Sequence, residues 1–141
     1  MRGSEQADVL IAGTDDASGE ALVLTTPISF WGGIDPKTGR VIDPRHPQFG
    51  ASIAGRALFL PGTIGSSSAS AVLLELVRVG IAPVAIVLHE PDAILLLGLI
   101  VAREMGWAHP PAIRLDRARH EAFAGSPVTV RVNGRIESAI R

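Results

Sequence analysis

The chain has 141 residues, with 13 lysines and arginines against 14 aspartates and glutamates, and a net charge of −1. This length suits one domain with a sizeable core, so we expect residues 1–141 to form a single domain. The balanced charge argues against nucleic-acid binding, which needs clustered cations. The absence of cysteine excludes disulfides, iron–sulfur ligation and thiol catalysis by this chain's own residues.

Apolar residues are abundant. They make up 47% of the chain, charged residues make up 19%, and the mean hydropathy is +0.32. The longest apolar run, residues 93–102, falls short of the roughly 20 residues of a membrane span. Residues 1–8 are polar and lack the apolar stretch of a targeting signal, so we expect a cytoplasmic protein without a membrane segment.

The first third of the chain predicts β structure followed by a long loop. Residues 9–12 and 21–25 are aliphatic runs typical of strands, separated by a turn-rich segment. Residues 28–31 continue or follow the second strand. Residues 32–50 then hold several glycines and prolines, including the turn Asp35-Pro36-Lys37-Thr38-Gly39. Definite turn chemistry in so long a segment favours an ordered, functional loop.

The remainder alternates strands and helices. Strands are expected at residues 57–60, 84–88 and 112–115, and helices at residues 66–79, closed by Gly80, and from the N-cap Asp92 to Met105. This alternation implies a parallel sheet with packed helices. Asn133-Gly134 between residues 128–132 and 135–140 predicts a C-terminal hairpin. The fold class is therefore α/β, with a second β layer.

The apolar run at residues 93–102 has no polar stripe. A helix that is apolar all round is buried on every side, which is difficult in so small a domain. Two interpretations stay open. The helix lies centrally between sheet layers, or it completes its burial against a partner chain.

The segment most able to carry chemistry is residues 62–70, where a strand passes into a helix. Its glycines allow close approach of a ligand to the backbone, and the first N–H groups of a helix attract anions. No lysine follows the glycine, as a P-loop requires, and the pattern of a hydrolase nucleophile elbow is absent. From the pattern alone, Ser66 or Ser67 as a simple helix cap is favoured over a catalytic role.

Several motifs in order resemble the small-subunit, or swivel, domain of the aconitase X family. The resemblance covers residues 21–111. The motifs are Phe30-Trp31-Gly32-Gly33-Ile34-Asp35-Pro36, Thr38-Gly39-Arg40-Val41-Ile42-Asp43, His46-Pro47, Gly65-Ser66-Ser67-Ser68-Ala69-Ser70 and Ala82-Pro83-Val84-Ala85-Ile86-Val87.

The resemblance implies a swivelling β/β/α domain that pairs with a separate or fused large subunit. It implies dehydration of a small hydroxy acid, cis-3-hydroxy-L-proline or mevalonate 5-phosphate, with the former favoured. An iron–sulfur cluster is expected on the large subunit and no cofactor on this chain. Ser66 matches the family's proton-abstracting serine, and we expect Gly65, Ser67 and Ser68 to bind substrate around it.

One departure from the family pattern concerns arginine. Thr63-Ile64 stands where the family has Gly-Arg, so Arg40 or Arg45 could bind a substrate carboxylate instead, although a solvated loop charge is the simpler interpretation. The four histidines show no metal-ligand spacing, and His46 alone lies in a family motif. The rival function is a non-catalytic swivel domain that binds an anionic ligand or a partner protein.

Overall fold

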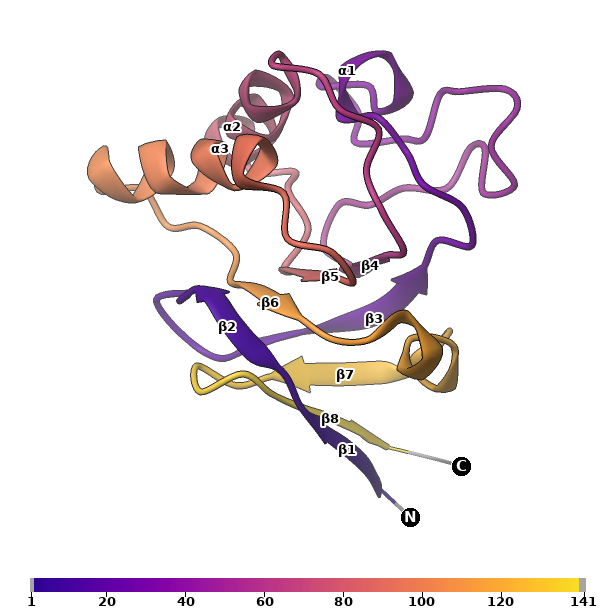
Figure 1. Ribbon diagram of the computed structural model, residues 1–141. Coiled ribbons are helices and arrows are strands. Elements are labelled where there is room, and N and C mark those ends of the chain that lie inside the picture. Colours follow the sequence, from indigo (N-terminus) through magenta and orange to yellow (C-terminus); the bar gives the residue numbers. More distant parts are fainter. Residues whose placement is uncertain (1, 140–141) are drawn as a thin grey trace.

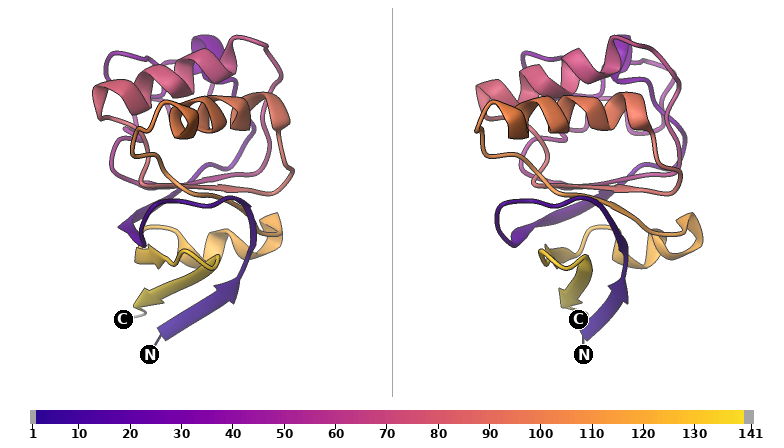
Figure 2. Two further views of the ribbon diagram at one scale, coloured as in Figure 1. Left: turned by 90° about the vertical axis from the view of Figure 1, so that its left-hand side faces the viewer. Right: turned by 60° about the vertical axis from the view of Figure 1, so that its left-hand side comes forward.

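The computed structural model describes residues 2–139 and has three layers. Helices cover one face of a mainly parallel sheet, and an antiparallel sheet covers the other face (Figures 1 and 2). This confirms the predicted β/β/α domain. The strands are β1 (Arg2–Gln6), β2 (Asp8–Ile11), β3 (Ala17–Val23), β4 (Ala57–Leu60), β5 (Ala85–Leu88), β6 (Ala112–Arg114), β7 (Pro127–Val130) and β8 (Arg135–Ala139). The helices are α1 (Phe30–Gly33), α2 (Ala69–Val79) and α3 (Ala93–Glu104), and η1 (Arg117–Arg119) and η2 (Glu121–Phe123) are 3-10 turns.

The strand order is β1-β8-β7-β3-β4-β5-β6-β2. Strands β3, β4, β5 and β6 pair in parallel, as the alternation of strands and helices predicts. Strand β3 belongs to both sheets, because residues 17–20 pair with β7 and residues 21–23 pair with β4. Strands β7 and β8 form the predicted hairpin, and Ile140 of its predicted second strand lies outside the described residues.

The central strands are buried on both faces, which explains their unbroken apolar sequences. All residues of β4 and β5 are buried. Leu58 and Leu60 of β4 pack into the core under the helices, whereas Ala57 and Phe59 pack into the core between the two sheets. Because successive side chains of a strand point to opposite faces of the sheet, one layer of strands contributes to two hydrophobic cores.

Helix ends agree with the local signals except at one point. The Asp92 carboxylate accepts from the N–H groups of Ile94 and Leu95, and Gly80 closes α2 in the left-handed conformation. Helix α2, however, begins at Ala69 rather than at Ser66. The reason is local, because the Ser66 hydroxyl oxygen accepts from the Ser68 N–H at 3.2 Å and holds residues 66–68 in a turn.

Helix α3 lies beside α2 in the outer layer, so the interpretation as a central helix between sheets is wrong (Figure 2). Its own side chains Leu95, Leu96 and Leu99 are buried on the side that faces the core. Ile94, Leu97 and Met105 on its other side are 47%, 50% and 59% exposed. A partner surface here stays a prediction. Within residues 2–139, no helix has the length and apolar character needed to cross a membrane.

The strands near the N-terminus depart most from expectation. Strand β1 falls in a polar segment where no strand was predicted, and it pairs only with β8 at the sheet edge. Strand β3 starts at Ala17, inside the predicted turn region. A side chain at Gly19 would come within 2.6 Å of the Gly55 carbonyl oxygen, so this glycine permits a close approach rather than a turn. Residues 28–31, expected to continue or follow the second strand, instead comprise an isolated bridge at Ile28 and the start of the short α1 at Phe30.

His120 is buried in the core between the sheets. It is 2% exposed, and its Nε2 donates to the Leu115 carbonyl oxygen at 2.8 Å. Its ring meets Phe59 edge-on, with centroids 5.4 Å apart. Burial is the largest influence on the His120 pKa and lowers it, because the charged ring would lose its hydration.

This burial predicts a loss of stability in mild acid. As the pH falls below the ordinary histidine pKa of about 6.5, the unfolded chain takes up a proton at residue 120 that the folded chain resists. The free energy of unfolding therefore falls until the pH drops below the pKa of His120 in the fold. Urea titrations between pH 7 and pH 5 should show a smaller loss in His120→Gln, which keeps an N–H donor. An equal loss in both proteins would contradict the prediction.

Candidate functional site

The carboxyl ends of the parallel strands meet at one edge of the sheet, where ligands bind in open α/β sheets. The segments that follow β3 and β4 run side by side there. Ile28 and Thr63 form a parallel bridge, and the Ile64 N–H donates to the Ile28 carbonyl oxygen at 3.0 Å. This pairing carries residues 65–68 upward to the start of α2 (Figure 1).

Ser66 is half-buried at this position, between the exposed Gly65 and the exposed Ser67. Its hydroxyl oxygen accepts the Ser68 N–H, and its carbonyl oxygen accepts the Ala69 N–H at 3.1 Å. The hydroxyl hydrogen has no acceptor among residues 2–139. An N–H that donates to the oxygen favours the alkoxide over the hydroxyl form, since it stabilises the added negative charge.

Backbone N–H groups without an acceptor in the described part of the chain occur at Ser66 and close to it in the sequence. The N–H groups of Ser66, Ser67 and Ser70 donate to no atom of the described residues. A side chain added at Gly65 would meet only open space. The segment therefore places a serine hydroxyl and unpaired N–H groups together on an accessible surface. Such a group of donors stabilises a carboxylate or an alkoxide. The four residues predicted for the site are consecutive in the chain, and Ser68, like Ser66, is half-buried.

Asp92 connects the segment before α2 to the start of α3 at this edge. Besides capping α3, its carboxylate accepts the Thr63 hydroxyl at 2.7 Å. The sequence pattern predicts only a capping role for Asp92. Its bond to Thr63 joins the segment before α2 to the first turn of α3, and so helps to position Ser66.

Asp92→Ala is expected to lower the free energy of unfolding by about 1–2 kcal/mol, because the cap is lost and Thr63 loses its acceptor. Asp92→Asn should cost far less, since asparagine caps helices as well as aspartate does. Urea unfolding followed by circular dichroism measures both values. Equal stability of Asp92→Ala and the parent would show that the cap contributes nothing.

The loop formed by residues 34–50 is ordered, as expected. His46 is 6% exposed, and both ring nitrogens are bonded to backbone. Nδ1 accepts from the Gln48 N–H at 3.0 Å, and Nε2 donates to the Thr26 carbonyl oxygen at 3.1 Å. The Gln48 side chain also bonds to Thr25. His46 therefore ties the loop to the segment after β3, which is a structural role.

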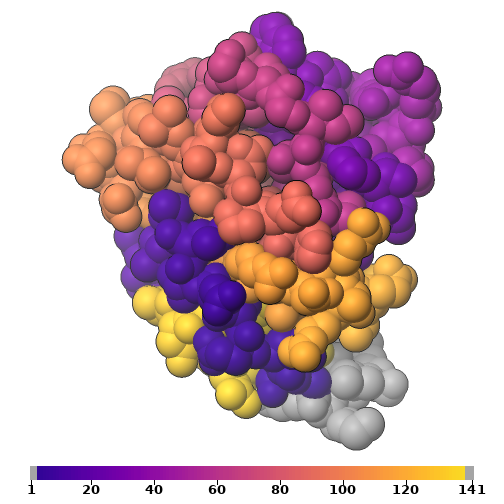
Figure 3. Space-filling view, viewed as in Figure 1, coloured from indigo at the N-terminus to yellow at the C-terminus, as the bar shows by residue number. Residues whose placement is uncertain are grey.

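A hollow lies between this loop, α1 and Ile64. Trp31, Ile42 and Ile64 line it and are all exposed, and Arg45 lines it as well. Figure 3 shows the loop and the segment leading into α2 at the same end of the molecule. The hollow is therefore next to the serine segment. Arg40 is engaged elsewhere, because its guanidinium donates to the Gly50 carbonyl oxygen at 2.9 Å.

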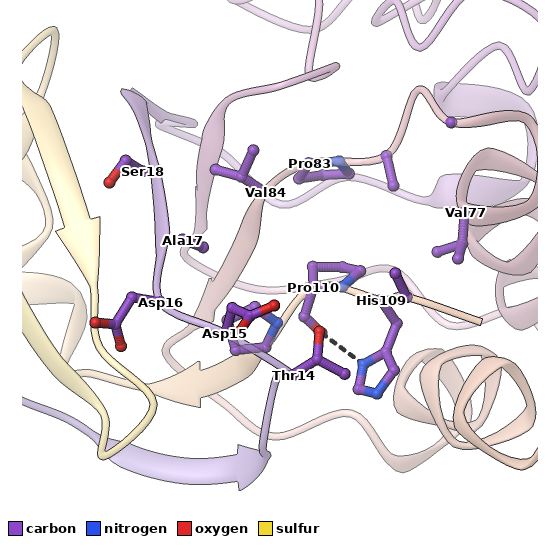
Figure 4. Close-up of a pocket in the computed structure, with 14 residues that line it drawn as sticks. Thr14, Asp15, Asp16, Ala17, Ser18, Val77, Pro83, Val84, His109 and Pro110 are labelled. Atoms are coloured by element: carbon purple, nitrogen blue, oxygen red, sulfur yellow. Dashed lines mark hydrogen bonds between the residues drawn. The ribbon is translucent and has the colours of Figure 1, made fainter. Parts of the chain in front are cut away.

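A second hollow opens at the amino ends of the parallel strands (Figure 4). Thr14, Asp15, Pro83 and Pro110 line it, and His109 donates from Nδ1 to the Pro110 carbonyl oxygen at 3.1 Å. None of the residues predicted for the site lines this hollow. The two hollows therefore lie at opposite ends of the sheet.

No cluster of three or more histidine, aspartate or glutamate side chains within residues 2–139 is placed to hold a metal ion. The chain also has no cysteine. Without thiolate ligands, its residues do not fit an iron–sulfur cluster.

Residues 6–140 match the family model of the aconitase X swivel domain. The chain belongs to the aconitase X family. Among its relatives, a cis-3-hydroxy-L-proline dehydratase from Pseudomonas aeruginosa is 47% identical over 91% of this chain, which spans only 22% of that protein. A phosphomevalonate dehydratase small subunit from Methanopyrus kandleri is 39% identical over 84% of both chains.

The fold agrees with this membership. The crystal structure of Thermococcus kodakaraensis aconitase X in its holo form superposes with a TM-score of 0.84, at 31% identity, over 98% of this chain and 99% of that chain. The first of the two dehydratases is about four times as long as this aconitase X swivel domain, whereas the archaeal small subunit is similar in length. Related domains therefore occur both within long chains and as separate subunits.

Proposed function

We propose that this chain is the swivel-domain component of a hydro-lyase that dehydrates a small hydroxy acid together with a large, cluster-bearing component. The observation that carries the proposal is Ser66 at the carboxyl edge of the sheet, whose hydroxyl hydrogen has no acceptor among residues 2–139 and whose own N–H and that of Ser67 are unpaired. The names of the two dehydratase relatives support the reaction class. The substrate we favour is cis-3-hydroxy-L-proline, because that relative is 47% identical.

The proposed role of Ser66 is that of the base. Dehydration removes a proton from one carbon and hydroxide from its neighbour, so that a double bond forms and water leaves. The Ser66 alkoxide takes the proton and becomes a hydroxyl, while Gly65, Ser67 and Ser68 bind the acid through their backbone and hydroxyl groups. A serine alkoxide is costly at neutral pH, and the donated N–H of Ser68 reduces that cost.

In this proposal, the group that deprotonates Ser66 and the iron–sulfur cluster both come from the large component. No basic side chain among the described residues accepts a hydrogen bond from the Ser66 hydroxyl. The iron–sulfur cluster likewise belongs to the large component, since this chain does not fit one. The chain alone is therefore expected to be catalytically silent.

Reconstitution tests this function. The chain and the large component that accompanies it are purified together, and dehydration of cis-3-hydroxy-L-proline and of mevalonate 5-phosphate is measured. We expect turnover of the first acid by the complex and none by the chain alone. Turnover of the second acid instead would assign the activity of the archaeal small-subunit relatives, which match most of this chain. A stable complex without activity on either acid would favour the non-catalytic swivel domain.

A further inference from the structure

We propose that Arg45 binds the carboxylate of the hydroxy acid and holds the substrate against Ser66. This inference rests on the proposed function, and it names the group that gives the site its affinity for an acid. The first argument is location. Arg45 and Ile64 line the same hollow, and Ile64 is two residues before Ser66.

The second argument is that the Arg45 guanidinium is available. Its only ionic contact joins Nε to the Asp43 carboxylate at 3.7 Å, and its side chain is 92% exposed. That same Asp43 oxygen already accepts the Arg45 N–H at 3.0 Å. The two terminal nitrogens have no partner among residues 2–139, so the planar fork that suits a carboxylate is free.

Other arginines at this end of the molecule are less suitable. The Arg40 guanidinium is bonded to the Gly50 carbonyl oxygen. The Arg114 guanidinium donates to the His89 carbonyl oxygen at 2.9 Å. Arg117 is exposed, but it lines a different hollow, together with Leu24, Pro61 and His120.

The third argument is that the backbone of Arg45 is held in place. The neighbouring His46 is fixed through both ring nitrogens, and its N–H donates to the Asp43 carbonyl oxygen at 3.1 Å. An arginine on a fixed backbone loses less entropy on binding than one on a mobile loop. A charge-assisted fork in the hollow that Ile64 lines, together with the unpaired N–H groups of Ser66 and Ser67 that follow Ile64 in the chain, would supply two types of donor for one acid.

The test uses the reconstituted complex and whichever acid it dehydrates. Arg45→Gln should raise KM about 10- to 100-fold with little change in kcat, as expected when uniform binding of the substrate is lost. Arg45→Lys keeps the charge without the fork and should give an intermediate KM. Arg117→Gln removes the same charge from the neighbouring hollow and should leave KM unchanged. Gel filtration of each variant checks that the complex is intact.

An unchanged KM in Arg45→Gln would overturn the inference, and so would a rise in Arg117→Gln in its place. Failure of Arg45→Gln to form the complex would also overturn it, because Arg45 would then be a contact with the large component. Complete inactivity of the parent complex towards both acids would instead count against the proposed function. Failure of the Arg45 inference and failure of the proposed function can be told apart, because the activity of the parent complex is measured before that of the variants.

Discussion

Replacement of Ser66 by alanine is expected to lower kcat of the reconstituted complex about 10²- to 10⁴-fold, the usual contribution of a positioned base. Alanine removes the oxygen that would take the substrate proton, and with it the acceptor of the Ser68 N–H, but it removes none of the backbone N–H groups. KM should change little, because the binding groups remain. Steady-state kinetics with the preferred acid measures both parameters.

The control is a substitution of the nearby Ser70. Ser67 is exposed, and its carbonyl oxygen accepts the Ser70 hydroxyl at 3.3 Å. Ser70→Ala removes a hydroxyl of equal size one helical turn further on, and it should retain nearly full kcat. Exchange of solvent deuterium into the substrate separates the base from a structural role, because only loss of the base stops exchange while the complex stays folded. Undiminished turnover or exchange in Ser66→Ala would remove Ser66 from the mechanism.

Gly98→Leu is expected to destabilise the fold by about 3 kcal/mol or more, because α2 and α3 touch at this residue. A Cβ atom at Gly98 would come within 2.6 Å of the Ser70 carbonyl oxygen, and backbone atoms cannot move aside without shifting the helix. Ser70 is in the first turn of α2, so the shift reaches the serine segment. We therefore expect a fall in kcat as well as in the urea midpoint.

Two variants make this prediction specific. Gly98→Ala gains about 1 kcal/mol of helix propensity but still crowds Ser70, so its loss of stability should be smaller than that of Gly98→Leu. Leu97→Ala lies on the exposed side of α3, where Leu97 is 50% exposed, and it should cost little. A Gly98→Leu protein as stable as the Leu97→Ala protein would show that the helices do not rely on this close contact.

The features that the sequence predicts well are those that local chemistry decides. The apolar run Ala57–Leu60 is a strand with the predicted bounds. Asp92 caps the start of α3 and Gly80 closes the end of α2, as their residue types indicate. Strand β1 was missed because its polar sequence carries no strand signal, and only pairing with β8 makes it one. The first half of β3 was missed for the same reason, since it depends on β7.

In the candidate site, too, the locally encoded features are predictable from the sequence and the contacts between distant residues are not. The serine segment between a strand and a helix is visible in the sequence, and so is the family resemblance around it. The bond between Thr63 and Asp92 joins residues 29 positions apart, and that between His46 and Thr26 joins residues 20 apart. No short pattern encodes such pairs. The hollow shared by Arg45 and Ile64 likewise depends on the loop folding back over α1.

Strand β3 has one more consequence, because its two halves belong to different sheets. Ala21 packs between the two sheets, and Leu24, which directly follows the strand, packs under the helices. Unfolding either layer would break the pairing that holds this strand in the other. We therefore expect the two cores to form one cooperative unit, in which the helical layer and the antiparallel layer melt together rather than in turn.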